Sequence, residues 1–241
     1  MTDITDKTGA SALLKAAPWD QAALGMPAWE LAEYSAAALD AADATPGHQT
    51  IKVDPLADKG ALHARGFYYA DTLLETVARP DQLRPLKPLD GHNMSVAARI
   101  VDIRREFDLD AALAICHGAF AHGRYHRDFQ LDPAGASLRY DNWLRQLAAA
   151  GTVYGLFAEG ELAGFIAYQG NNLVLHAVAP SHRGRGLAKY WWRQVICALF
   201  ADGHATVTSS ISASNMAVLN LYATQGFSFR HPQDIYHRIV K

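Results

Sequence analysis

The stretch HRGRGLAKYWW, residues 182–192, joins a loop rich in glycine and arginine to an apolar helical pattern. The segment NNLVLHAVA, residues 171–179, reads as a strand and leads through Pro180 into this loop. Strand, glycine-rich loop and helix in this order are typical of an anion site. The first N–H groups of a helix have no internal partner, and the helix dipole places partial positive charge there. We therefore predict that the loop holds phosphate groups, with a pyrophosphate as the natural guest.

Particular residues support this prediction and exclude two common phosphate loops. Gly184 and Gly186 let the backbone approach a phosphate without a Cβ in the way, and Arg183 and Arg185 add positive charge. No lysine followed by Ser or Thr closes the loop, so it is not a P-loop. Lys189 stands where the dinucleotide-binding pattern G-x-G-x-x-G needs its third glycine.

The composition is that of an ordinary globular protein. The chain has 241 residues, of which 50% are hydrophobic and 19% charged, enough for one large domain or two small ones. The formal net charge of −2 gives no broad basic face, so we expect no nucleic-acid partner and only a local anion site.

Several further expectations rest on features that the sequence lacks. The first residues, MTDITDKTGASALLK, have neither the basic start nor the apolar run of a signal peptide, and no run of about 18 apolar residues suggests a membrane span. We therefore expect a cytoplasmic protein. Cys116 and Cys197 lie in apolar helical patterns and are predicted to be buried free thiols. His122 and His126 have helical spacing but no evident third ligand, so we expect no metal site.

The N-terminal part is predicted to be a separate region. It holds a helical pattern at residues 28–42, a short strand at 50–53, and the segment GFYYADTLLETV at 66–77. Three prolines within nine residues interrupt the chain that follows, so residues 79–93 are predicted to be a linker.

The C-terminal part gives a clearer pattern, in the order β-α-α-β-β-β-α-β-α-β-β. Residues 152–170 read as a hairpin with Glu159-Gly160 at the turn. One helix is predicted to start at Asp108 or Asp110, and another at Ser214 or Asn215. The remaining predicted elements are a strand at 95–103, a helix at 109–121, a helix at 137–151, a strand at 171–180, a helix at 186–203, a strand at 205–213, a helix at 215–226, and two strands within 227–241.

Two segments and the order of elements resemble one family. Arg183-x-x-Gly186-x-Ala188 resembles the R/Q-x-x-G-x-G/A signature of the GNAT superfamily of acetyl-CoA-dependent N-acetyltransferases, and SNMAVLNLYATQGF, residues 214–227, resembles its N-x-x-A-x-x-x-Y-x-x-x-G-F motif. The resemblance covers roughly residues 96–241. It implies an α/β fold with a splayed central mixed β-sheet flanked by helices, and acetyl-CoA as co-substrate without a metal.

The resemblance also implies a set of cofactor-binding residues. Loop amides would hold the pyrophosphate of coenzyme A, and the strand before the loop would bind the pantetheine through its backbone. Asn215, at a helix start, is placed to reach the cofactor. The implied set is Ala177, Val178, Arg183, Gly184, Arg185, Gly186, Leu187, Ala188 and Asn215.

Tyr222 is the predicted general acid, which the resemblance implies and the chemistry supports. It lies seven residues after Asn215, on the same face of a helix. When an amine attacks the thioester, coenzyme A leaves as a thiolate, and a phenol with a reference pKa of about 10 is a fitting proton donor. The alternative is that Tyr222 is an interface or core aromatic. His176 is a candidate base, a substrate contact or a half-buried packing residue, and a water relay is equally open.

The acceptor is suggested by the segment FAHGRYHRDFQLDPAGASLRYDNWLRQL, residues 120–147. It resembles the F-x-x-x-R-[YF]-H-x-D stretch and following Tyr-x-x-Trp of the dTDP-fucosamine acetyltransferase group. The resemblance implies that Arg124, Tyr125, His126 and Asp128 bind substrate. The alternative is a hydrogen-bonded loop that packs the two halves together.

The N-terminal segments PWDQAALGMPAWEL, residues 18–31, and GFYYADTLL, residues 66–74, also resemble this group, with Leu24 in place of an aromatic residue. The resemblance implies a degenerate half-GNAT region at residues 1–92 and a catalytic domain at 93–241. The implied activity is acetyl transfer to the primary amine of a nucleotide-linked deoxyamino sugar. Two alternatives stay open: N-acetylation of another small amine (an amino acid, metabolite or toxin) and non-catalytic binding of acyl-CoA. A homodimer is also left open.

Overall fold

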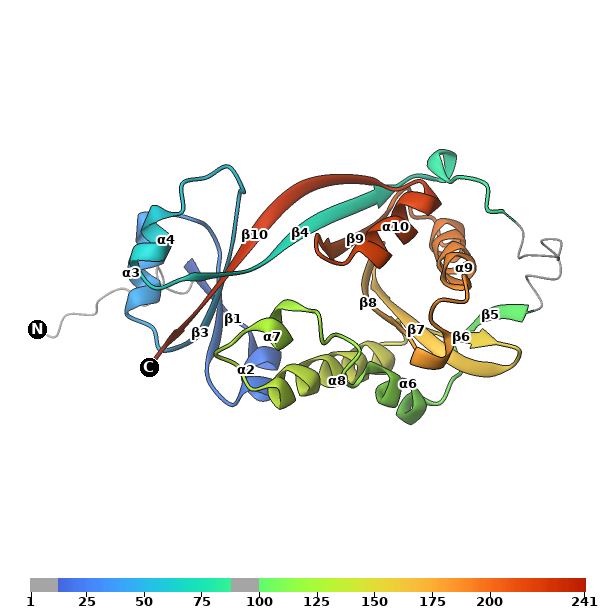
Figure 1. Ribbon diagram of the computed structural model, residues 1–241, viewed down its shortest axis with the longest axis horizontal. Coiled ribbons are helices and arrows are strands. Elements are labelled where there is room, and N and C mark those ends of the chain that lie inside the picture. The colour runs from blue at the N-terminus through green and yellow to red at the C-terminus, as the bar shows by residue number, and fades with distance from the viewer. Residues whose placement is uncertain (1–12, 88–99) are drawn as a thin grey trace, which may run out of the picture. The chain divides into compact units, whose positions relative to one another are not determined.

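The computed structural model describes residues 13–87 and 100–241, which form two compact units (Figure 1). The first unit takes the chain up to residue 73 together with residues 121–139 and 232–241. The second takes residues 74–120 and 140–231, apart from the undescribed part. The units are thus interleaved along the chain. The boundary predicted between residues 92 and 93 lies outside the described residues.

The first unit is a small sheet with helices. Its strands follow the order β1-β2-β3-β10-β4, with β2 and β3 parallel and β10 antiparallel to β3. The strands β4 and β10 and the helix α8 each continue into the second unit. The elements are β1 (Leu14–Ala16), α2 (Pro18–Leu24), β2 (Ala28–Leu31), α3 (Ala36–Asp43), β3 (Gly47–Val53), α4 (Gly60–Ala64), β4 (Tyr68–Ala78), α7 (Arg124–Arg127), α8 (Pro133–Ala149) and β10 (Ser228–Val240).

The helix predicted over residues 28–42 is wrong in its first half. Residues 28–31 form strand β2, and the helix α3 begins only after Ser35, whose Oγ accepts from the Ala38 N–H at 3.2 Å. Ala28 and Leu31 are both buried at a spacing of three, which matches one face of a helix, whereas in a strand the two side chains point to opposite faces. Residues 28–31 form a strand because they pair with β1 and β3. The local sequence pattern does not show this pairing, which depends on the tertiary fold.

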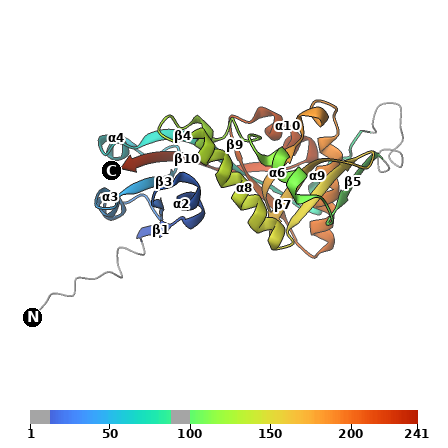
Figure 2. The ribbon, with the colours of Figure 1, turned by 90° about the horizontal axis from the view of Figure 1, so that it is seen from below.

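The second unit is a mixed sheet with helices on both faces. The strand order is β10-β4-β9-β8-β7-β6-β5, antiparallel from β5 to β8 and parallel between β8 and β9. Helix α6 lies on one face, and α9 and α10 lie on the other (Figures 1 and 2). The elements not yet listed are η1 (Pro80–Gln82), β5 (Val101–Arg104), α6 (Leu109–Cys116), β6 (Val153–Ala158), β7 (Glu161–Gln169), β8 (Asn172–Val178), η2 (Pro180–His182), α9 (Ala188–Ala201), β9 (Val207–Ser212) and α10 (Met216–Gln225).

The predicted mixed α/β fold is confirmed, and so is the splay within its sheet. Strand β8 pairs with β9 only at Asn172–Thr208 and Leu173–Ser209, although both strands continue for several residues. The core beneath the sheet is apolar and dominated by α9, where Trp191 is fully buried. Burial of one face of each helix against the sheet is the main stabilising term of this unit.

Local signals located most elements of this unit correctly. The hairpin turn at Glu159-Gly160 is confirmed, with φ of 52° and 88° at the two residues. Asp108 and Asn215 are the N-caps of α6 and α10. The strand predicted at residues 95–103 is described only from residue 100, and β5 occupies Val101–Arg104.

Two predictions are wrong. The two terminal strands are one strand, β10, in which His231 has a φ of +46° before Pro232. A single left-handed residue bends a strand as a bulge does and does not reverse the chain. Cys116 is buried and free, but Cys197 is free and exposed on α9. None of the helices in the described residues is long and apolar enough to cross a membrane.

Gly226, just after α10, is required by a close backbone contact. Its φ is +99°, and an added Cβ would lie 2.1 Å from the carbonyl oxygen of Gln82. Gly203, just after α9, has a φ of +93° with open space around it. We expect Gly203→Ala to lower the free energy of unfolding by about 1–2 kcal/mol, the cost of the left-handed conformation. Gly226→Ala should cost about 1–3 kcal/mol more, because the backbone must also move. Urea denaturation measures both, and equal losses would contradict the contact.

Candidate active site

The loop between β8 and α9 presents open backbone amides. Gly184 and Gly186 have φ of +73° and +71°, and nothing lies within 4 Å of a Cβ added at either. Leu187 precedes the helix and provides no side-chain cap. No side chain caps the first N–H groups of α9, although the Tyr190 N–H donates to the Leu187 carbonyl at 3.0 Å. The dipole of this 14-residue helix favours an anion at its start.

The two arginines of the loop differ in their surroundings. The Arg183 Nε–H donates to the Val178 carbonyl oxygen at 2.7 Å, so this side chain ties the loop to the end of β8. Both Arg183 and Arg185 are exposed. Their predicted role toward the cofactor stays a prediction, but Arg183 has a bracing role in addition.

The backbone of β8 alternates between two sides. The Ala179 N–H donates to the Ala163 carbonyl at 2.8 Å, and in an antiparallel ladder every second residue bonds to the same neighbour. The peptide groups of Ala177 therefore face β7, while those of His176 and Val178 face the gap opened by the splay. Of the two predicted backbone contacts to pantetheine, this geometry favours Val178 over Ala177.

Tyr222 lies on α10 and is fully buried. Its ring packs edge-on against Phe227, with 4.8 Å between the centroids. In the described residues its hydroxyl has no hydrogen-bond partner within bonding geometry. Burial raises the pKa of Tyr222 to about 12, while the neighbouring Ser209 and Trp192 act to lower it. The phenol is thus protonated at neutral pH, which is the form that a general acid needs.

His176 projects from β8 toward the same place. Its ring centroid lies 6.3 Å from that of Tyr222 and 4.9 Å from that of Trp192, against which it packs edge-on. Burial lowers the pKa of His176 to about 4, so the ring is neutral at pH 7. A neutral imidazole is able to accept a proton, but at this pKa it is a weak base.

Two residues near Tyr222 were not predicted as site residues. Trp192 is buried with no partner for its Nε1 among the described residues, and the Ser209 hydroxyl donates to the Leu173 carbonyl at 2.7 Å. Trp192 lies in an apolar helical pattern, and Ser209 lies in a β-branched strand. Neither pattern distinguishes a packing residue from one that lines a site.

Asn215 is the N-cap of α10. Its Oδ1 accepts from the Val218 N–H at 3.3 Å, which holds the start of the helix that carries Tyr222. Because Oδ1 is used in the cap, the predicted contact with the cofactor would be made by the side-chain N–H groups of Asn215.

The predicted acceptor residues lie in the first unit, where two of them are buried in a hydrogen-bond network. The Tyr125 hydroxyl donates to Asp20 Oδ2 at 3.0 Å. Asp128 accepts from the Tyr68 hydroxyl at 2.8 Å and lies 2.7 Å from His237 Nδ1. Burial acts to raise the pKa of Asp128, but its hydrogen bonds outweigh this and lower it.

The other two acceptor residues are partly exposed. His126 Nε2 lies 3.0 Å from the Ser137 Oγ, and the Arg124 guanidinium lies 4.9 Å from the Tyr125 ring centroid. For Tyr125 and Asp128 the contacts favour the packing alternative. Arg124 and His126 have more accessible surface than Tyr125 and Asp128.

Comparison with known proteins agrees with this geometry. Residues 120–227 match the model of the Acetyltransferase (GNAT) family. A GCN5-related N-acetyltransferase from Sphaerobacter thermophilus superposes with a TM-score of 0.57 at 15% identity, over 80% of this chain and 60% of that one. The chain thus spans less than two thirds of that protein. A putative acetyltransferase from Novosphingobium aromaticivorans gives 0.52 at 19%, over 90% and 86%.

A third structure is a glucosamine N-acetyltransferase region within a fungal multi-domain GH3 β-N-acetylglucosaminidase. It gives a TM-score of 0.51 at 11% identity, over 88% of this chain and 30% of that one. Among curated proteins, none matches the chain by sequence.

The chain has the GNAT acetyltransferase fold. The splayed strands and the glycine loop before α9 lie within the stretch that matches the family model, residues 120–227. The dTDP-fucosamine group, by contrast, stays a prediction.

The buried ring of His176 makes stability depend on pH. Its pKa of about 4 lies below the value of about 6.5 expected in the unfolded chain, so the unfolded state binds the proton more tightly. Stability is therefore lost as pH falls from about 6.5 toward 4. We expect His176→Phe to remove up to about 3 kcal/mol of this loss, measured by urea denaturation at several pH values.

The control is His122→Gln, a change at an exposed histidine, measured by urea denaturation at the same pH values. This variant should follow the wild-type pH profile. If the His176→Phe profile also coincided with the wild type, the ring would not be desolvated.

Proposed function

We propose that the protein transfers the acetyl group of acetyl-CoA to the primary amine of a small molecule. The observation that carries the proposal is the arrangement within the second unit. Strand β8 forms one side of the gap between β8 and β9, and it leads into the loop with open amides at the start of α9. The buried Tyr222 phenol lies near His176 of β8 and Ser209 of β9. A loop for the pyrophosphate and a proton donor for the thiolate are the two parts that such a transfer needs.

The chemical steps can be assigned to residues. The amine nitrogen attacks the thioester carbonyl carbon, and the developing oxyanion is stabilised by a backbone N–H that faces the gap, with Val178 the best placed. The C–S bond then breaks, and the Tyr222 O–H gives its proton to the departing thiolate sulfur. The proton lost by the amine leaves through His176 or through water. One proton is lost by the amine and one is gained by coenzyme A, so the step is balanced.

The acceptor that we favour is a nucleotide-linked deoxyamino sugar. Its support is the resemblance of residues 120–147 to the dTDP-fucosamine acetyltransferase group, with Arg124 and His126 as the accessible candidates for binding. Amino-sugar acetylation also occurs on this fold, since one structural relative is a glucosamine N-acetyltransferase region. Another small amine is the alternative acceptor.

Other parts of the proposal rest on sequence alone. We propose a degenerate half-GNAT region at residues 1–92 and a catalytic domain at 93–241. Action in the cytoplasm, without a nucleic-acid or membrane partner, is our expectation from the composition.

Binding of the cofactor can be tested by thermal shift. Acetyl-CoA should raise the melting temperature, because a ligand that binds only the folded state stabilises it. A dTDP-linked amino sugar should raise it further. We expect Gly186→Glu to abolish the shift with acetyl-CoA, because a carboxylate would repel the pyrophosphate at the open loop. Gly203→Glu places the same side chain at a similar φ after α9 and should leave the shift unchanged.

The outcomes of this experiment separate the proposals. A shift with acetyl-CoA but with no sugar keeps the transferase and directs the acceptor search to other amines. A shift that survives Gly186→Glu removes the loop from the cofactor site.

Tyr222→Phe separates an enzyme from a non-catalytic acyl-CoA-binding protein. We expect turnover to fall by about 10²–10⁴-fold, the range for loss of a general acid, while acetyl-CoA binding persists. Stability should be nearly unchanged, because the hydroxyl has no hydrogen-bond partner in the described structure.

Tyr190→Phe is the matched control, since it removes a buried tyrosine hydroxyl whose partner is the Lys87 carbonyl, to which it donates at 2.6 Å. Unaltered turnover in Tyr222→Phe would contradict the assignment of the general acid.

A further inference from the structure

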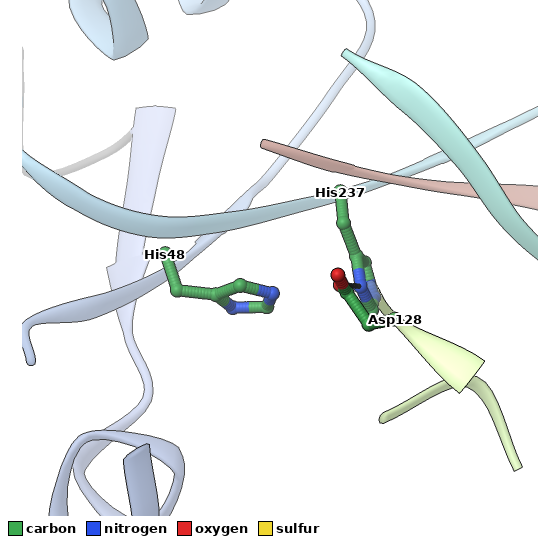
Figure 3. Close-up of side chains that lie close together, drawn as sticks. All are labelled: His48, Asp128 and His237. Atoms are coloured by element: carbon green, nitrogen blue, oxygen red, sulfur yellow. Dashed lines mark hydrogen bonds and ion pairs between the residues drawn. The ribbon is translucent and has the colours of Figure 1, made fainter. Parts of the chain in front are cut away.

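Three polar side chains from distant parts of the chain meet in the interior of the first unit. His48 lies on β3, Asp128 follows α7, and His237 lies on β10. Figure 3 shows the three side chains directed toward one another. Asp128 and His237 are 109 residues apart, so their spacing in the sequence does not indicate the cluster. Its members are nearly inaccessible, with exposed fractions of 1%, 6% and 0%.

The cluster has more ligand atoms than it uses. Neither ring nitrogen of His48 has a hydrogen-bond partner in the described residues, and the same holds for His237 Nε2. Buried polar atoms normally have a partner, and an unpaired one costs about 1–3 kcal/mol. Three unpaired nitrogen atoms in one interior place therefore point to a ligand that supplies the missing interactions.

We propose that His48, Asp128 and His237 bind one divalent transition-metal ion. One ligand atom from each residue lies within 4.8 Å of those of the others. If all three separations were at this limit, the point equidistant from the three atoms would be about 2.8 Å from each, against about 2.0–2.2 Å in zinc sites, so side-chain rotations must bring the ligands closer together. Two imidazoles and a carboxylate suit Zn²⁺ and its neighbours in the first transition row.

The hydrogen bonds around the cluster support this assignment. Asp128 Oδ2 lies 2.7 Å from His237 Nδ1, so an ion bound by both residues would take the place of this hydrogen bond. The Tyr68 hydroxyl donates to both Asp128 oxygens, at 2.8 and 3.0 Å, and holds the carboxylate in place.

Charge and burial also bear on the site. Burial lowers the pKa of His48 to about 3 and lowers that of His237, so both rings are neutral, the form that binds metals. Arg124 and Arg139 are nearby cations that oppose binding, and the carboxylates of Asp128 and Asp20 offset them. An ion here would join β3, β10 and the segment after α7, and would stabilise the folded first unit.

The test uses the full chain without a histidine tag, purified without chelators. Elemental analysis should find about one equivalent of metal per chain after gel filtration. After treatment with a chelator, adding Zn²⁺ alone should raise the melting temperature by on the order of 5–10 °C at saturation. Adding Co²⁺ to the same protein should give visible absorption bands of a cation with nitrogen and oxygen ligands.

Variants assign the ligands. His48→Gln should abolish the stoichiometric binding of metal and the Co²⁺ bands, and Asp128→Asn should weaken binding about 10–100-fold. His63→Gln, an exposed histidine of the same unit, should bind as the wild type does. The wild-type measurements stand even if a variant fails to fold. A wild-type chain with no retained metal and no response to Zn²⁺ or Co²⁺ would overturn the proposal and leave a water molecule as the occupant. Wild-type affinity in His48→Gln would do the same for the assigned ligands.

Discussion

Strand β8 separates from β9 after two paired residues, and the chemistry proposed for the second unit depends on that separation. A backbone inside a sheet has its N–H and C=O groups occupied by neighbouring strands. Where β8 leaves β9, the peptide groups of His176 and Val178 lose that neighbour and face a gap. The Arg183 side chain donates a hydrogen bond to the Val178 carbonyl, which keeps the end of the strand in place without closing the gap.

The helices that follow β8 and β9 place the loop amides and Tyr222 at the gap. The splay carries β8 into the loop whose amides begin α9, and β9 leads into α10 with Tyr222 two turns from its start. Asn215 fixes the first turn of α10, while Gly226 ends the helix with a left-handed residue against Gln82. Tyr222 is therefore held from both ends of a short helix, and its position depends little on its own hydroxyl.

Sequence reasoning succeeded where a signal is local. Glycines with positive φ, caps such as Asp108, and alternating apolar residues located most elements of the second unit. It failed where distant segments decide: residues 28–31 became a strand because β1 and β3 flank them, and the chain end became one strand because His231 bends it without reversing it. The predicted roles of the loop and of Tyr222 rest on motifs. Trp192, Ser209 and His48 carry no local mark, since only the tertiary fold places them beside other polar groups.

Each unit holds both paired and unpaired buried polar groups. In the first unit, Asp20 pairs with Arg139 and accepts from Tyr125, so most of its charge is satisfied by protein. In the second unit, the Tyr222 hydroxyl and the Trp192 Nε1 have no partner among the described residues, and both side chains lie beside the gap where a thioester is proposed to bind. A folded chain tolerates such groups at a cost in stability, and a ligand that supplies the missing partner recovers that cost on binding. The unpaired nitrogen atoms of His48 and His237 fit the same rule, which is why a bound cation, and not further packing, is the occupant that their chemistry favours.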